Sequence, residues 1–148
     1  MAEISTNIIL DGITLAIRAE YPDCQIFTDE VEQGLNPGDF IVLLLDANKD
    51  REIGPRYTLS TLFDIHYFPK SENDPTNINK DCYAVADQLE AALELITLPT
   101  GDPLRGTGMN WEVVDGVLHF FVSYAPRYFR PTDDGDPMQE FNYTPSVV

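Results

Sequence analysis

The stretch from Asn110 to Tyr124, NWEVVDGVLHFFVSY, constrains the fold more than any other part of the chain. Two apolar runs flank Asp115-Gly116, which is a strong signal for a β-hairpin with a two-residue turn. Pairing across the turn builds an apolar face from Val113 opposite Leu118, Trp111 opposite Phe120 and Met109 opposite Val122. The other face is mixed and carries Asn110, Glu112, Val114, Val117, His119, Phe121 and Ser123. We therefore expect one face in the core and the other against solvent or a partner.

Further strands are predicted upstream of this hairpin. Alternation predicts a long half-buried strand from Tyr57, which Pro69 ends. One of its faces carries Tyr57, Leu59, Thr61, Phe63, Ile65 and Tyr67, and the other carries Thr58, Ser60, Leu62, Asp64, His66 and Phe68. Phe40 to Leu45 (FIVLLL) is apolar throughout, so we expect a central strand with helices on one face and another cover, such as a neighbouring subunit, on the other. Gln25 to Thr28 reads as a short strand.

Apolar residues at helical spacing predict two helices. The first spans Ser5 to Tyr21, with Ser5 or Thr6 as its N-cap and Gly12 as a mark of close packing. The second runs from Asn79, its expected N-cap, to about Leu95. Polar residues 46–55 are expected to form a loop or hairpin tip, residues 97–108 a linker, and the second hairpin arm to continue past Pro126 to Arg130.

The predicted fold is therefore α+β, in the order α-β-β-β-α-β-β. An antiparallel sheet of about five strands with two helices packed on one face buries the apolar faces that the sequence pattern predicts. Residues 1–130 are expected to form one domain, and residues 131–148 an acidic C-terminal arm that contains prolines.

The charge of the chain excludes several classes of partner. Nine basic and 25 acidic residues give a formal net charge of -16. Such a chain has no cationic surplus with which to bind nucleic-acid phosphates or anionic lipid. No secretory signal or membrane-length apolar run is visible, so synthesis in the cytosol is expected. Cys24 and Cys82 lack the spacing of a metal or redox motif and are expected to be free thiols.

No motif indicates catalysis or nucleotide binding, and we expect no enzyme activity and no cofactor. Gly101, Gly106 and Gly108 lie close together, but no helix pattern follows them, so a phosphate cradle is not expected. His66 and His119 fall on the mixed faces of predicted strands and can be neighbours. A metal site would need a third ligand. We therefore expect no metal, and we interpret His119 as paired across the hairpin with Glu112.

Five collinear segments carry a family resemblance: IFTDEVEQGL, FIVLLL, RYTLSTLFDIHYFPKSE, CYAVADQLEAALELI and PLRGTGMNWEVVDGVLHFFVSY. Across roughly Glu20 to Tyr128 the chain resembles the phage tail terminator proteins of phages and prophages of Gram-positive bacteria. The resemblance implies a virion structural protein of the neck, assembled in the host cytoplasm and located at the tail–head junction. It implies a ring, expected to be hexameric, that caps the tail tube, stops its polymerisation and joins the tail to the head-side connector.

The resemblance also implies partners. These are further copies of the chain, the tail tube protein, the head–tail connector protein and, in a contractile tail, the sheath. No membrane is expected, and DNA would pass through an acidic lumen without specific binding. Three regions are the expected contacts: the Asp46 to Arg56 loop, the acidic Asp29 to Gly34 segment and the Pro131 to Val148 arm. The candidate interface residues are Asp29, Glu30, Glu32, Asp46, Lys49, Arg51, Arg56, His119, Phe121, Phe141 and Tyr143.

Simpler and competing interpretations stay open. Each contact region also reads as a solvated loop or frayed end. The chain can instead be another head–tail connector or tail completion protein of similar fold. A third interpretation is an acidic DNA-mimic inhibitor, which would be a monomer that captures a basic protein in a salt-sensitive manner.

Overall fold

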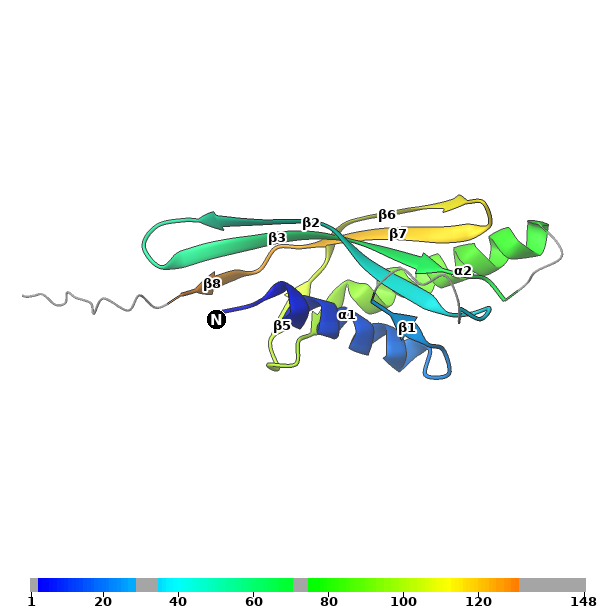
Figure 1. Ribbon diagram of the computed structural model, residues 1–148, viewed down its shortest axis with the longest axis horizontal. Coiled ribbons are helices and arrows are strands. Elements are labelled where there is room, and N and C mark those ends of the chain that lie inside the picture. The colour runs from blue at the N-terminus through cyan, green and yellow to red at the C-terminus, as the bar shows by residue number, and fades with distance from the viewer. Residues whose placement is uncertain (1–2, 29–34, 71–74, 131–148) are drawn as a thin grey trace, which may run out of the picture.

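The fold is a twisted, mostly antiparallel sheet with both helices on one face (Figure 1). The computed structural model describes residues 3–28, 35–70 and 75–130. Its elements are α1 (Thr6–Glu20), β1 (Ile26–Phe27), β2 (Phe40–Arg51), β3 (Arg56–Tyr67), α2 (Pro75–Leu93), β4 (Leu95–Thr97), β5 (Pro103–Arg105), β6 (Thr107–Val114), β7 (Val117–Tyr124) and β8 (Arg127–Phe129). The predicted α+β class and helix placement are confirmed, with six strands in the main sheet.

Strand β3 is the centre of the sheet, which runs β1-β2-β3-β7-β6 with β8 paired to the start of β3. The predicted alternation in β3 is confirmed, because the side chains from Leu59 to Tyr67 that face the helices are buried. They pack in one core with residues from both helices and β7, including Ile9, Ile13, Ile17, Leu89, Leu93, Phe120 and Val122. Strand β1 pairs parallel to β2, whereas the other pairings in this sheet are antiparallel.

Helix α1 matches its sequence signals closely. The Ser5 side chain accepts a hydrogen bond from the Ile8 N–H at 3.2 Å, which makes Ser5 the N-cap. A Cβ atom on Gly12 would lie only 2.9 Å from Leu98 Cδ2, so the glycine does mark close packing. The segment that follows α2 therefore approaches α1 at Gly12.

Helix α2 begins at Pro75, one turn before Asn79, so the prediction that Asn79 is the N-cap is wrong. Proline suits the first helical position because its fixed φ is already helical and its missing N–H would have no partner there. Its buried face comprises Cys82, Val85, Ala86, Leu89 and Leu93. Neither helix in the described part of the chain has the length and hydropathy of a membrane-spanning segment.

Strand β2 departs most from its prediction. Phe40, Ile41 and Val42 are buried, but Leu44 and Leu45 are 44% and 51% exposed, so the run is not covered on both faces. Leu45 lies at a register shift, and the strand continues to Arg51 in antiparallel pairing with β3. Residues 46–51, expected in a loop or hairpin tip, therefore form a strand, and the tip is shorter.

The β6–β7 hairpin has its predicted turn. Asp115 and Gly116 have φ values of 53° and 76°, as a type I′ turn requires. The pairs Trp111–Phe120 and Val113–Leu118 are confirmed. The Met109–Val122 pair is not, because the register shifts between Thr107 and Asn110. Part of the expected linker after α2 forms a second small sheet of β4 and β5.

Candidate functional site

The sheet face that points away from both helices carries a group of polar side chains and several half-buried apolar ones. We call it the outer face and define it by Ile41, Leu43, Leu62, Asp64, His66, His119 and Phe121. Leu43, Leu62 and Phe121 are half-buried although α1 and α2, the helices of the described residues, both lie on the opposite face of the sheet (Figure 1). An apolar sheet face without a helix over it is typical of a surface that a partner covers.

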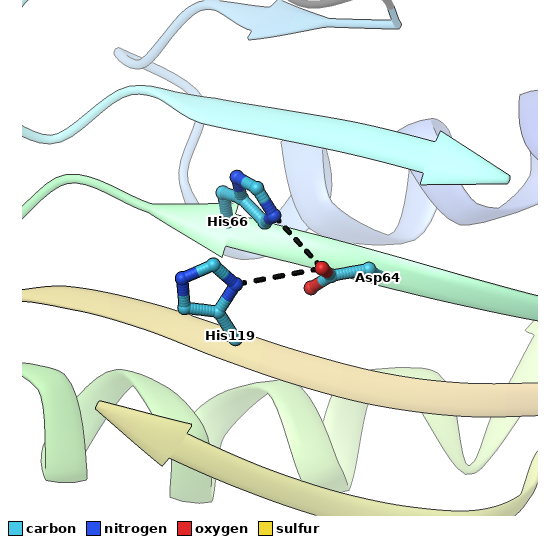
Figure 2. A network of polar contacts seen from close by, with 3 residues as sticks. All are labelled: Asp64, His66 and His119. Carbon is cyan, nitrogen blue, oxygen red and sulfur yellow. Dashed lines mark hydrogen bonds and ion pairs between the residues drawn. The ribbon is translucent and has the colours of Figure 1, made fainter. Parts of the chain in front are cut away.

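A polar cluster of Asp64, His66 and His119 lies in the middle of the outer face (Figure 2). His66 is two residues after Asp64 on β3, and β7 places His119 directly opposite His66. Asp64 Oδ2 is 2.8 Å from His66 Nε2 and 3.4 Å from His119 Nδ1. Asp64 is only 7% exposed, and its Oδ1 atom is buried without a hydrogen-bond partner in the part of the chain that the structure describes.

The cluster differs from the pairing that we expected. Glu112 is opposite His119 in the β6–β7 register, as predicted. However, the carboxylate that contacts the His119 ring is Asp64, from the strand on the other side of β7. Alternation in the sequence places Asp64 and His66 on one strand face but assigns no role to Asp64. The sequence signal for a contact between Asp64 and a histidine was their spacing, because residues two positions apart lie on the same face of a strand.

A second feature is the distal part of the β2–β3 hairpin, which projects beyond the helices (Figure 1). We call it the β2–β3 extension and define it as residues 44–58 together with residues 127–130, which include β8. Five of the nine basic residues of the chain lie on it: Lys49, Arg51, Arg56, Arg127 and Arg130. Several of these cations contact aromatic rings; for example, Arg130 lies 4.8 Å from the centre of the Tyr57 ring.

The candidate interface residues chosen from the sequence fall into separate places. Asp46, Lys49, Arg51 and Arg56 lie together on the β2–β3 extension and are exposed. His119 and Phe121 lie on the outer face of β7. The others, Asp29, Glu30, Glu32, Phe141 and Tyr143, lie outside the described residues.

A hollow of about 560 Å³ opens beside the end of α1, and two of the carboxylates that line it already accept hydrogen bonds. Asp39 accepts two backbone N–H groups. Asp81 accepts the Tyr67 hydroxyl at 3.1 Å and the Lys70 N–H at 2.8 Å. Both carboxylates hold loops against the sheet and helices through hydrogen bonds. These structural roles explain their positions, and no substrate is needed to account for them.

Buried tyrosines should make the protein sensitive to alkaline pH. Burial raises the pKa of Tyr21 to about 12, and burial together with Asp81 raises the pKa of Tyr67. Above pH ~10 these groups ionise in the unfolded chain but not in the folded one. The stability they confer is therefore fully present below pH ~10 and is lost as the pH rises beyond it, by up to about 1.4 kcal/mol per pH unit for the buried Tyr67. Urea unfolding at several alkaline pH values measures this loss.

A Tyr67→Phe variant is the control for this prediction. It lacks one titrating group, so its stability should fall less steeply with pH above ~10, although the lost hydrogen bond to Asp81 lowers its stability at neutral pH. Identical slopes in the two proteins would show that Tyr67 does not carry the alkaline effect.

Comparison with known proteins gives the family. The search of curated proteins found no match. A family model described as "Phage tail terminator protein" matches residues 8–136, which is most of the chain and includes every described strand and nearly all of both helices. The chain therefore belongs to the phage tail terminator protein family.

Proposed function

We propose that copies of this chain form a ring, expected to be a hexamer, at the end of the phage tail tube. The ring stops tube polymerisation and joins the tail to the head-side connector. As a phage tail protein the chain is a component of the virion, and the junction below the head is its proposed position. The observation that carries this proposal is the family match, together with apolar surface that one copy leaves uncovered. The role is structural and contains no catalytic step.

Exposed apolar residues support contacts between copies. Leu44 and Leu45 are about half exposed on the β2–β3 extension, and Ile53 at its tip is 90% exposed. Exposed apolar side chains at the base and at the tip of a projecting hairpin are typical of a surface that a partner buries. The extension reaches past the helices, so it is long enough to lie on an adjacent subunit (Figure 1).

Charge supports a head-to-tail arrangement of the copies. The five cations of the β2–β3 extension accompany only three acidic residues there, Asp46, Asp50 and Glu52. The rest of the chain is therefore even more acidic than the net charge of -16 indicates. A basic extension on one copy complements an acidic surface on the next. Contacts between two different patches generate rings when the rotation closes.

The acidic surface also suits a channel for DNA. A ring multiplies the negative charge of each copy around its lumen, and like charges repel the phosphates of DNA. DNA would then pass without specific binding. The tube protein and the connector are the proposed partners on the two sides of the ring, with the sheath as a further partner in a contractile tail.

The test uses phage that lack this chain. A terminator predicts tubes of excess and variable length, whereas a connector predicts headless tails of normal length, and electron microscopy distinguishes the two. Phage carrying Leu45→Asp should reproduce the overlong tubes, because a charge replaces an apolar contact on the β2–β3 extension. Leu15→Asp on α1 is the matched control, since Leu15 is equally exposed at 54% but lies away from the extension.

The mass of the purified protein, measured alone and with tail tube protein, tests the ring itself. A ring-sized species that forms with the tube protein and is lost in the Leu45→Asp variant supports the proposal. Tubes of normal length without this chain, or a protein that stays a monomer with the tube protein, would contradict it.

A further inference from the structure

We propose that Asp64, His66 and His119 bind one divalent transition-metal ion, Zn²⁺ by their chemistry, on the outer face of the sheet. Each side chain offers one ligand atom, and the three atoms lie within 4.8 Å of one another. The site belongs to a single chain, so the proposal does not depend on ring formation or on the proposed function. It reverses the expectation from sequence, because the structure supplies the missing third ligand.

The backbone positions the three ligands. Asp64 and His66 are two residues apart on β3, so both side chains leave the same face of the sheet. The β3–β7 register places His119 opposite His66, and the two rings meet edge to face with their centres 4.2 Å apart. All three side chains come from central strands, which hold a site more precisely than loops do.

The distances suit tetrahedral zinc. Zn–N and Zn–O bonds of about 2.0–2.1 Å place tetrahedral ligand atoms about 3.3 Å apart. Asp64 Oδ2 lies 2.8 Å from His66 Nε2 and 3.4 Å from His119 Nδ1, on either side of that value (Figure 2). Small rotations of the side chains would complete a shell of two nitrogens and one oxygen, with a fourth position open to water.

Asp64 supplies an independent observation. Its carboxylate is more than nine-tenths buried, and Oδ1 has no hydrogen-bond partner among residues 3–28, 35–70 and 75–130. A buried carboxylate oxygen without a partner is costly, and such groups are normally paired or coordinate a metal. The register places Leu43 and Phe121 on either side of Asp64, so its surroundings are apolar and the attraction to a cation is strengthened.

The ligand set selects the type of metal. Ca²⁺ and Mg²⁺ take shells of oxygen ligands, and two imidazoles disfavour them. Zn²⁺ accepts histidine and carboxylate together and imposes no geometry of its own. Three protein ligands and an open fourth position characterise zinc sites that keep water or accept a further ligand.

The alternative is a hydrogen-bonded network without metal, in which both ring N–H groups donate to Asp64 Oδ2. The metal-bound site and the metal-free network differ in protonation, because an imidazole nitrogen that coordinates a metal carries no proton. The chain has only two histidines, so the nitrogen NMR spectrum of the rings reports on this site alone. Metal binding should shift His66 Nε2 and His119 Nδ1 selectively.

Calorimetric titration of the chelator-treated full chain with Zn²⁺ is the first experiment. We expect one saturable ion per chain, no matching signal with Ca²⁺ or Mg²⁺, and the visible spectrum of tetrahedral cobalt when Co²⁺ replaces Zn²⁺.

Asp64→Asn and His119→Gln should each weaken Zn²⁺ binding by about 10-fold or more, since each removes a ligand. Asp46→Asn is the matched control, because it removes the same charge from an exposed carboxylate on β2, on the same face of the sheet. It should change the affinity less than 2-fold, within the usual effect of a screened surface charge.

Several results would overturn the proposal. The first is the absence of saturable Zn²⁺ binding. The second is an equal loss of Zn²⁺ affinity in Asp46→Asn and His119→Gln. The third is a Co²⁺ spectrum typical of an ion that keeps six oxygen ligands. If a ligand variant fails to fold, the NMR experiment on the unmodified chain decides the matter, and ring nitrogens that do not shift with Zn²⁺ would refute the site.

Discussion

Replacing Tyr124 with alanine should lower the free energy of unfolding by about 3–5 kcal/mol, the usual cost of truncating a buried aromatic side chain to alanine. Tyr124 is among the largest fully buried side chains, and its hydroxyl donates to the Leu93 carbonyl at 2.6 Å. That carbonyl belongs to the last residue of α2 and has no partner within the helix. The loss is a large part of the 5–15 kcal/mol that stabilises an ordinary domain. Urea unfolding, or a melting temperature lowered by about 10 °C, measures it.

Tyr124→Phe separates the hydroxyl from the ring. It keeps the packing but leaves the Leu93 carbonyl without its donor, and it should cost about 1–3 kcal/mol. The difference between the two variants then gives the contribution of the ring. If Tyr124→Ala were no worse than Tyr124→Phe, the core would be able to collapse around the cavity and the argument from packing would be wrong.

Gly106→Ala should destabilise the protein by about 2–3 kcal/mol through overpacking. A Cβ atom at this position would lie 2.6 Å from the same Leu93 carbonyl oxygen and 2.9 Å from Val122 Cγ2. The nearest atom is backbone at the end of a helix, so it cannot move aside cheaply. Gly106 also donates its N–H to the Glu94 carbonyl at 2.8 Å, so a shift of the backbone would break a hydrogen bond.

Gly12→Ala is the matched control, since Gly12 is also buried and also tightly approached. Its closest neighbours are the ends of the Leu98 and Ile96 side chains, which can adjust, and alanine favours the helix by up to about 1 kcal/mol. The Gly12 variant should therefore stay within about 1 kcal/mol of the original stability. Equal losses at Gly12 and Gly106 would contradict the distinction between a flexible neighbour and a rigid one.

These two predictions concern one junction, where the end of α2 meets β7. The Leu93 carbonyl accepts the Tyr124 hydroxyl, and a Cβ atom added at Gly106 would lie 2.6 Å from the same oxygen. Substitutions that share a contact are usually not additive. The double variant Tyr124→Phe with Gly106→Ala should therefore differ from the sum of the single effects by about 0.5 kcal/mol or more.

The sequence predicted the parts of the fold that rest on local rules. The Ser5 cap, the turn at Asp115-Gly116 and the alternation in β3 each follow from hydrogen bonds or side-chain directions within a few residues. The class of fold followed from these elements, because two amphipathic helices and a half-buried sheet have few ways to bury their apolar faces. The family resemblance was visible in the sequence and was confirmed by the family model.

The sequence could not show that residues 46–51 form a strand. Strands exposed on both faces need no apolar alternation, so polar residues there resemble a loop. Antiparallel pairing with β3, from Asp46 opposite Leu62 to Arg51 opposite Tyr57, decides the conformation, and backbone pairing of this kind leaves no periodic signal in polar side chains. Leu44 and Leu45 lie at the register shift in this pairing and are 44% and 51% exposed, which an unbroken apolar run does not indicate.

The polar cluster on the outer face shows the same division. Composition and alternation put His66, His119 and Asp64 on strand faces, and so determined which side of a strand each would occupy. Which of them touch was decided by the register between β3 and β7, and a shift of one residue would turn every side chain of β7 to the other face. Register depends on packing over the whole sheet, and this is why only the tertiary structure brought the carboxylate of Asp64 into contact with both imidazole rings.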